Sequence, residues 1–431
     1  MILLFGVLLI VLLLVLGLPL ALSFLVGSVF VLIGYHFPLQ WVALQPFYAI
    51  DSFPLMAIPF FVLAGRLMQD SGISDRIFKF LHFFIGRLRG GLGATAILAC
   101  MFFGTISGSS VATVSAIGSV MIPEMERNGY TRAYATALIS AAGFLGVLIP
   151  PSIPGILWAM MAELSIAKVF LTTVGPGILL GAAYIGVNFL MHGRKQPKVK
   201  ASLTLPEYAS NFAVSIKQGF FALLMPVIIL GGIYGGIFTP TEAAAVAVVY
   251  GFLVGFVIYR SLKWKNLYEI FMQSALASAV LLITVALAAG VGGRVFTVLQ
   301  VPNAVSEWIV GITQNPRMFL LLINLFLLLL GMFLDCNTII LIFTPVFMAM
   351  GKRYGIDPYH LGAIVLLNTE IGLITPPVAG NLFVGCMISG LTIDQIWKPL
   401  VPFLCVCMPV LAIVTLFPEI ALWIPELILG R

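Results

Sequence analysis

Long apolar stretches alternate with short polar connections along almost the whole chain. Stretches of roughly 20 apolar residues suit helices that cross a bilayer, and examples cover residues 169–191, 219–238 and 243–259. No long polar part of the chain is left over for a soluble domain. The pattern predicts an all-α polytopic membrane protein.

Two of the apolar stretches are interrupted by residues that break helices. The first interruption reads GVLIPPSIPG at 146–155, and the second reads GLITPPVAGN at 372–381. Irregular backbone at membrane depth is tolerated only where it is buried in protein or lines a cavity. A single proline kink can serve packing alone, but two copies of the motif favour a functional site.

Around these breaks the chain repeats itself. Three residue pairs share a separation of 226 positions: Gly146/Gly372, Pro150/Pro376 and Pro151/Pro377. Further upstream, Pro123 pairs with Pro345 at a separation of 222 positions, which predicts a four-residue insertion in the second copy. The chain is therefore expected to be a duplication around the polar link that follows residue 192.

Each break is preceded by a polar cluster between two short apolar arms. The clusters read GTISGSSVAT at 104–113 and FLDCNTI at 333–339. Arms of about a dozen residues are too short to cross the bilayer, and they suit a re-entrant hairpin whose tip stops inside it. We therefore predict a first repeat over 1–192 (hairpin 92–125, broken helix 131–162), a polar cytoplasmic link over 193–217, and a second repeat over 218–431 (hairpin 317–351, broken helix 360–391).

Composition supports the membrane assignment and narrows the partners. Hydrophobic residues make up 61% of the chain and charged residues 9%, and the mean hydropathy is +1.14. The net charge of +6 is spread over short connections, so binding to nucleic acid is not expected. The basic run HGRKQPKVK at 192–200 should be cytoplasmic by the positive-inside rule. The five cysteines show neither a zinc spacing nor a disulfide pattern.

The hairpin tips and the breaks together suggest ion and anion chemistry. Half-helix N-termini direct N–H groups at anions, whereas free carbonyls and Ser, Thr or Asn oxygens can coordinate Na⁺. No phosphate-binding G-x-x-x-x-G-K-[ST] motif occurs in the chain. Coupling to a Na⁺ gradient is therefore expected rather than coupling to ATP.

Four ionisable residues in apolar surroundings need separate interpretation. Asp335 lies in the second tip and favours a functional role; Glu370, one turn before the second break, could be functional or structural. Glu242 is interpreted mainly as a residue of the first helical turn. Arg294 follows an apolar helix, and glycines at 290, 292 and 293 are expected to let the backbone unwind there. Its guanidinium could bind a carboxylate through two hydrogen bonds, or it could extend to the membrane surface.

At these motifs the sequence resembles the large membrane subunit of TRAP transporters, the tripartite ATP-independent periplasmic family. The resemblance covers essentially the whole chain and rests on these segments: AIPFFVLAG, SGSSVATVSAIGSVMIPEM, GVLIPPSIP, YGGIFTPTEAAAVA, LDCNTIILIFTPVF and HLGAIVLLNTEIGLITPPVAGNLFV. It implies two inverted repeats and a sodium-coupled elevator that imports an organic acid. It also implies a bacterial cytoplasmic (inner) membrane, a small four-helix membrane subunit and a periplasmic substrate-binding protein as partners.

The same resemblance implies a set of site residues. Its candidates for binding substrate are Ser107, Ser109, Ser110, Thr113, Asn337, Thr338 and Asn381, and Arg294 joins them because of its guanidinium chemistry. The candidates for holding sodium are Ser107, Gly108, Gly146, Pro150, Asp335, Cys336, Gly372, Thr375 and Pro376. Na⁺ is the expected coupling ion, no organic cofactor is expected, and the substrate could be sialic acid, a C4-dicarboxylate or a related carboxylate.

Two other functions have to be weighed against transport. A channel could also use re-entrant hairpins, although filters usually need several chains around one axis. A hydrolase could use the serines of the first tip, but their spacing is not Gly-x-Ser-x-Gly, and no histidine lies in either tip or break. We therefore expect a transporter rather than an enzyme.

Overall fold

The computed structural model describes residues 1–86, 88, 90–192 and 205–430. Within these ranges every regular element is a helix, which confirms the all-α prediction. Four of the described helical segments are long and apolar enough to cross a membrane: Ile166–His192, Pro240–Ile258, Trp264–Val298 and Ile393–Leu416. Three bent pairs bring the possible spans to seven, and one of them is the predicted first broken helix, Arg132–Leu148 with Ile153–Met161, bent by 44°.

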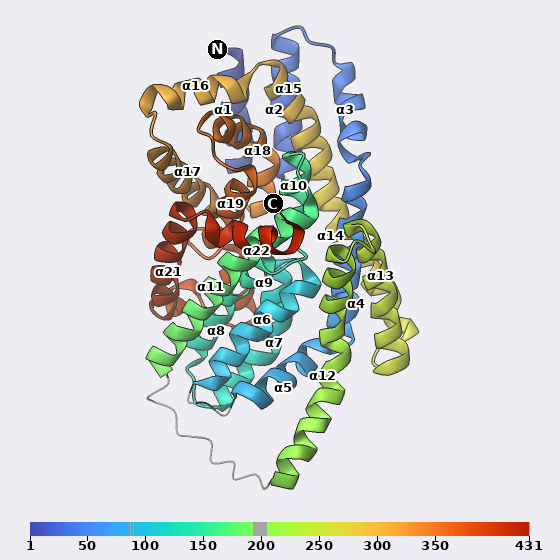
Figure 1. Cartoon of the computed structure of the whole chain (residues 1–431). Helices are drawn as coiled ribbons and strands as arrows, with labels where there is room; N and C mark the ends of the chain where they lie inside the picture. Colours follow the sequence, from blue (N-terminus) through green and yellow to red (C-terminus); the bar gives the residue numbers. More distant parts are fainter. Residues whose placement is uncertain (87, 89, 193–204, 431) are drawn as a thin grey trace.

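Helix contacts divide most of the molecule into two groups (Figure 1). The group that we call the scaffold contains α1 (Ile2–Val15), α2 (Leu20–Gly34), α3 (Gln40–Ile50), η1 (Phe53–Met56), α4 (Ala57–Asp70), α12 (Leu205–Tyr234), α13 (Pro240–Phe252), η2 (Leu253–Ile258), α14 (Trp264–Thr284), η3 (Val285–Gly292) and α15 (Gly293–Val298). Of the predicted link 193–217, residues 193–204 lie outside the described residues, and α12 already begins at Leu205.

The second group, which we call the hairpin core, holds both tips and both breaks. Its first repeat contains α6 (Gly91–Ser107), α7 (Ser110–Arg127), α8 (Arg132–Ala142), α9 (Leu145–Leu148), α10 (Ile153–Met161) and α11 (Ile166–His192). Its second repeat contains α17 (Pro316–Gly331), α18 (Cys336–Arg353), α19 (Pro358–Gly372), α20 (Gly380–Ser389), α21 (Ile393–Leu416) and α22 (Glu419–Leu429). The two connecting helices are α5 (Ile73–Ile85) and α16 (Val301–Ile312).

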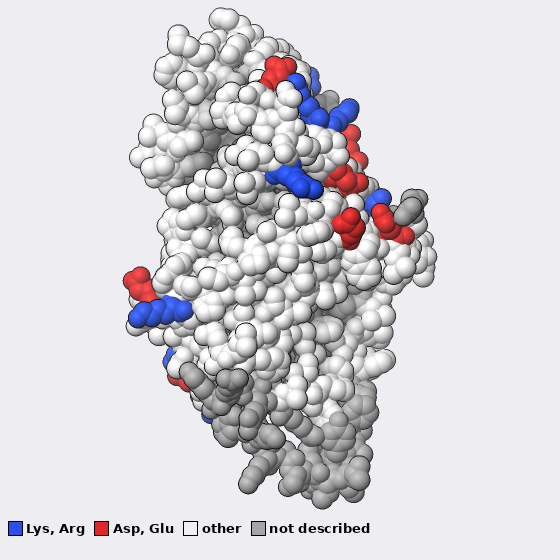
Figure 2. Space-filling model, turned by 60° about the vertical axis from the view of Figure 1, so that its left-hand side comes forward, with Lys and Arg blue, Asp and Glu red and all other residues white. Residues whose placement is uncertain are grey.

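The two repeats have opposite orientations in the molecule. Helix α5 leads from the scaffold into the first hairpin, and α16 leads from the scaffold into the second. In Figure 1 α5 lies near the bottom of the molecule and α16 lies at the top, so the hairpins enter from opposite ends. On the side shown in Figure 2, uncharged residues cover a broad area and the charged residues form a few small groups, as expected for a protein surrounded by lipid.

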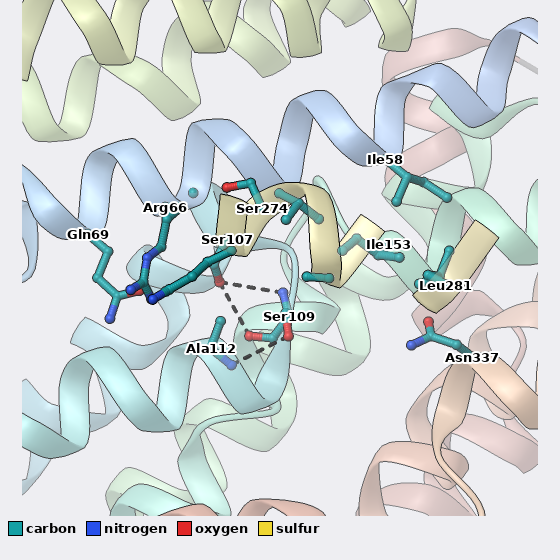
Figure 3. Close-up of a pocket in the computed structure, with 14 residues that line it drawn as sticks. Ile58, Arg66, Gln69, Ser107, Ser109, Ala112, Ile153, Ser274, Leu281 and Asn337 are labelled. Carbon is teal, nitrogen blue, oxygen red and sulfur yellow. Dashed lines mark hydrogen bonds between the residues drawn. The ribbon is translucent and has the colours of Figure 1, made fainter. Parts of the chain in front are cut away.

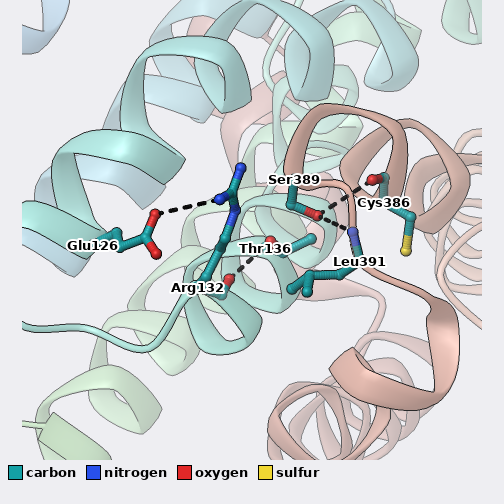
Figure 4. Close-up of polar contacts among 6 residues, drawn as sticks. All are labelled: Glu126, Arg132, Thr136, Cys386, Ser389 and Leu391. Carbon is teal, nitrogen blue, oxygen red and sulfur yellow. Dashed lines mark hydrogen bonds and ion pairs between the residues drawn. The ribbon is translucent and has the colours of Figure 1, made fainter.

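Each repeat packs its second half-helix against the hairpin of the other repeat. Helix α10 contacts α18, and α20 contacts both α7 and α8. Figure 4 shows Arg132 and Thr136 of α8 beside Ser389 at the end of α20, with Arg132 paired to Glu126 at 3.8 Å. The repeats therefore interlock, and neither forms a separate domain.

The predicted four-residue insertion in the second copy is wrong. Helices α7 and α18 each have 18 residues, and their first residues, Ser110 and Cys336, are separated by the same 226 positions as the breaks. Pro123 and Pro345 both lie inside these helices, about one turn apart in the two copies. They are therefore not equivalent positions.

The expected unwinding near Arg294 is also wrong. The helix continues from Trp264 to Val298, and residues 285–292 widen into a π-helix rather than an irregular break. A π-helical turn keeps the backbone hydrogen-bonded while changing the direction of the side chains. Arg294 thus lies on a continuous scaffold helix.

Candidate functional site

The first tip is a tight reversal between α6 and α7. Helix α6 ends at Ser107, and Gly108 adopts a φ of +62°, a conformation that glycine accepts without steric cost. The Ser109 hydroxyl then caps α7 by accepting a hydrogen bond from the Ala112 N–H (3.4 Å). The Gly108 carbonyl accepts from the N–H of Ile153 (3.2 Å), which joins the tip to the first break.

The second tip has the same plan with an acid at the cap. Asp335 accepts hydrogen bonds from the N–H groups of Asn337 (3.1 Å) and Thr338 (3.4 Å) and from the Thr338 hydroxyl. The Met332 carbonyl accepts from the Val378 N–H (3.2 Å), which joins this tip to the second break. A carboxylate at this position complements the positive end of α18.

Paired glycines bring each hairpin into backbone contact with its own break. Gly104 of α6 lies against Gly146, and Gly331 of α17 lies against Gly372. A Cβ added to Gly331 would lie 2.9 Å from the Gly372 Cα, and one added to Gly104 would collide with Gly146. The Pro150–Pro151 and Pro376–Pro377 peptides that follow are both cis.

A cavity of about 330 Å³ opens between the first tip and the scaffold (Figure 3). Three predicted site residues line it: Ser107, Ser109 and Asn337. The scaffold contributes polar residues that the sequence analysis missed: Arg66 and Gln69 from α4, and Gln273 and Ser274 from α14. Three buried polar atoms of this lining have no hydrogen-bond partner, namely Arg66 Nε, Ser274 Oγ and Asn337 Oδ1.

Arg66 is the cationic residue of this cavity. Its Nε lies 3.6 Å from the Asp70 carboxylate, one turn further along α4. At this distance the contact is an ion pair without a hydrogen bond, and such pairs contribute little stability when they are accessible to solvent. The guanidinium therefore keeps hydrogen-bonding capacity for a bound anion.

The other predicted substrate residues do not line this cavity. Ser110, Thr113, Thr338 and Asn381 are buried within the hairpin core. Arg294 lines a second cavity of about 330 Å³, formed by α3, α10, α18 and the scaffold helix. There its guanidinium lies 5.1 Å from the centre of the Trp41 ring. The structure therefore separates Arg294 from the residues of the tips.

Comparison with known proteins identifies the family. Residues 7–420 match the model of the tripartite ATP-independent periplasmic transporter, DctM component. The chain belongs to the DctM family.

Relatives of this DctM-family chain carry several names. It is 38% identical over 400 residues to the C4-dicarboxylate TRAP transporter large permease protein DctM of Pseudomonas aeruginosa, covering 93% of this chain and 92% of that protein. It is 34% identical over 416 residues to the sialic acid TRAP transporter large permease protein SiaM of Vibrio cholerae, covering 96% of each. A third relative, the isethionate TRAP transporter permease protein DctMQ of Oleidesulfovibrio alaskensis, is 36% identical, and the match covers 95% of this chain but 64% of that longer protein.

A solved structure shares the fold. The YdaH transporter of Alcanivorax borkumensis, described as having an unusual topology, matches with a TM-score of 0.61 and 15% identity over 90% of this chain and 88% of that one. The DctM-family chain is thus a multi-pass membrane protein and the large permease component of a transporter.

We call the contact between each hairpin tip and the break of its own repeat a junction. The second junction of this permease, between residues 331–338 and 369–381, contains a buried acid. Glu370 is 1% exposed, and its carboxyl lies beside the Ser110 hydroxyl and the Cys336 thiol, at the first residues of α7 and α18. The Cys336 thiol also contacts the Thr369 hydroxyl (2.9 Å). Glu370 Oε2 and both polar side-chain atoms of Asn381, which is 0% exposed, have no hydrogen-bond partner.

The unpartnered oxygens at the second junction bear on whether a sodium ion could bind among the predicted residues. Na⁺ is a hard cation that takes oxygen ligands, and the unpartnered Glu370 Oε2 and Asn381 Oδ1 are such oxygens at the second junction. The Thr375 hydroxyl donates its proton to the Ile371 carbonyl (2.9 Å), which leaves the lone pairs of its oxygen available to an ion. Of the other candidates, Ser107, Asp335 and Cys336 would act through their side chains, and Gly108, Gly146, Pro150, Gly372 and Pro376 through backbone groups. These oxygen donors are of the type that a sodium ion takes.

Proposed function

We propose that this permease imports an organic acid by sodium-coupled transport with an elevator movement of the hairpin core against the scaffold. The substrate would be sialic acid, a C4-dicarboxylate or a related carboxylate, as the names of its relatives suggest. The observation that carries the proposal is the cavity between the scaffold and the first tip, which contains Arg66 and the polar groups of Ser107, Ser109 and Asn337.

The chemistry of the cavity suits a carboxylate. The guanidinium of Arg66 can donate two parallel hydrogen bonds to a carboxylate, and the neutral oxygens and amides around it can bind hydroxyl groups. Among the described lining residues there is no histidine and no acid. The cavity therefore favours anion binding over cation binding or acyl transfer.

The division into two groups of helices supports an elevator. One wall of the cavity belongs to the scaffold helices α4 and α14, and the opposite wall belongs to the hairpin core. A rigid movement of the interlocked core would carry the tips, the breaks and the bound ligand together. Na⁺ at the junctions would supply positive charge that stabilises the non-helical backbone and the buried Glu370 carboxylate.

The proposal includes the partners and the location that the family implies. A small membrane subunit would hold the scaffold, and a periplasmic binding protein would deliver the substrate to the open end of the cavity. The chain would lie in the bacterial inner membrane. No catalytic reaction is assigned to it.

Reconstitution tests the proposal directly. The complete transporter, with its membrane and periplasmic partners, would be placed in vesicles, and uptake of labelled sialate and succinate would be measured with an inward Na⁺ gradient, with K⁺ replacing Na⁺, and with ATP. We expect saturable uptake that requires the Na⁺ gradient and is unaffected by ATP. Uptake that persists without Na⁺ would contradict sodium coupling, and flux that never saturates would favour a channel.

A further inference from the structure

Two arginines of the scaffold, Arg66 and Arg294, occupy corresponding positions in the two repeats. Arg66 follows Gly65 and lies seven residues before α5 begins at Ile73. Arg294 follows Gly293 and lies seven residues before α16 begins at Val301. The sequences AGR at 64–66 and GGR at 292–294 are therefore the same element of the duplicated chain.

The two glycines nevertheless have different surroundings. A Cβ on Gly65 would lie 2.9 Å from the Ser107 Cα and 3.4 Å from the Ile106 carbonyl oxygen, so the first tip is packed directly against this glycine. A Cβ on Gly293 would meet no atom within 4 Å. The scaffold thus offers two matching contact points, and the hairpin core occupies one of them.

The first tip, which packs on Gly65, is buried, and the second tip is exposed. Ser107 in the first tip is 5% exposed, whereas Phe333 in the second tip is 61% exposed. Asp335 of the second tip is also exposed, as is Arg294 on the scaffold. Gly293 and Arg294 line the second cavity, whose other walls include Met160 and Pro345 of the hairpin core.

We propose that Gly293 and Arg294 form the docking site for the second tip when the hairpin core has moved to the other end of its travel. In that state residues 332–335 would pack on Gly293 as the first tip packs on Gly65 here. Arg294 would then complete a carboxylate site equivalent to the one that contains Arg66. This inference rests on the proposed elevator movement and specifies its second end point.

Both arginines have a partner that a carboxylate could replace. Each is held in place by a weak partner, Asp70 for Arg66 and the Trp41 ring for Arg294. A carboxylate with two charge-assisted hydrogen bonds can displace either partner. A scaffold with one cationic site at each end of the travel would offer a carboxylate a similar partner in both states.

A glycine substitution tests the docking site. Gly293→Val should leave the state described here intact, because its side chain would enter open space, but it should obstruct the second tip. Gly231→Val is the matched control, since Gly231 also lies within a scaffold helix and a Cβ there meets no atom. We expect both variants to match the wild type in thermal stability, and we expect Na⁺-driven uptake to fall at least tenfold for Gly293→Val and less than twofold for Gly231→Val. Uptake by Gly293→Val within twofold of the wild type would overturn the docking site.

Cross-linking provides a measurement that does not depend on uptake. The pair Gly293→Cys and Phe333→Cys, in the complete transporter with the exposed Cys405 replaced by Ser, should form a cross-link while the protein cycles. The pair Gly231→Cys and Phe333→Cys should not. If the wild type transports but the first pair never cross-links, the docking site is wrong and the proposed function stands. If the wild type does not transport under a Na⁺ gradient, the proposed function itself fails.

Discussion

The two junctions between tip and break share their backbone and differ in their side chains. In both, a glycine pair brings hairpin and break together, and the carbonyl of a tip residue accepts a hydrogen bond from the chain after the Pro–Pro pair. At a separation of 226 positions, however, the second junction has polar residues where the first has glycine or an apolar residue: Thr369 for Gly143, Glu370 for Phe144 and Asn381 for Gly155. The two repeats therefore share the backbone contacts of the junction and differ in the polar side chains around it.

The difference at Phe144 and Glu370 has a physical consequence. Phe144 is buried and packs edge-on against Tyr184, with a ring distance of 6.3 Å. Glu370 is equally buried, but none of the ion pairs found within the described residues involves it. Burying a carboxylate without a charged partner is costly, so its presence favours a role in ion binding at the second junction.

The largest expected effect tests the glycine contacts that both junctions share. Gly146→Val and Gly372→Val should each destabilise the fold strongly, because the new side chain would meet the backbone of Gly104 or Gly331, and overpacking of this kind typically costs ~1–3 kcal/mol or more. Yield and thermal unfolding of the purified protein measure the effect. Gly186→Val, where a Cβ meets no atom, should fold normally. A stable Gly372→Val variant would show that the second junction tolerates what the first does not.

The next effect tests the divergence of the junctions. Glu370→Gln keeps the shape of the side chain but removes the charged oxygen, and we expect at least a tenfold loss of Na⁺ affinity, or about 1.4 kcal/mol. The shift in melting temperature with Na⁺ concentration measures it, with uptake as a second measurement. Phe144→Leu at the equivalent position should keep the Na⁺ dependence. Equal Na⁺ responses from Glu370→Gln and the wild type would remove Glu370 from the ion site.

A smaller effect is expected for the two tips at the cavity. Ser109→Ala and Asn337→Ala each remove a polar group that lines the cavity, which should weaken substrate binding by about 1–3 kcal/mol. The KM for uptake is the measurement, with melting temperature as a check on folding. Ser119→Ala is the control, because that hydroxyl lies outside the cavity and bonds the Ala116 carbonyl within α7. An unchanged KM for both tip variants would contradict the cavity as the substrate site.

The smallest effects concern the caps of the two second half-helices. Ser152 caps α10 by accepting from the Gly155 N–H (3.2 Å), so Ser152→Ala should destabilise the protein by about 1 kcal/mol. At the start of α20, Ala379 has a φ of +46° and no side-chain cap. Ala379→Gly should therefore stabilise by about 1 kcal/mol, since glycine adopts this conformation without steric cost. Thermal unfolding in detergent checks both signs, and a loss of stability in Ala379→Gly would show that the Ala379 methyl group contributes more through packing than its backbone costs.

The sequence predicted the secondary structure correctly where the structure depends on hydrophobicity along the chain. The apolar stretches and the prolines that interrupt them predicted an all-helical fold with broken helices, because backbone hydrogen bonding in lipid leaves few alternatives to a helix. The alignment of Pro123 with Pro345 led to the wrong prediction of an insertion. A helix can accommodate proline at different turns, as α7 and α18 do here. The glycines near Arg294 led to the wrong prediction of an unwound backbone, because contacts with neighbouring helices stabilise a continuous π-helical turn there.

By itself the sequence determined the membrane location, the duplication and the polar composition of the tips and breaks, because hydrophobicity and proline act locally and can be read along the chain. Only the tertiary structure decided which polar groups meet. Arg66 carries no local signal that distinguishes it from Arg294, yet it lies in the cavity at the first tip, whereas Arg294 lies in a second cavity. The interlocking of the repeats and the occupation of Gly65 rather than Gly293 depend on the packing of helices that are far apart in the sequence. No local pattern specifies that packing, because two equivalent contact points in a duplicated chain have nearly the same sequence.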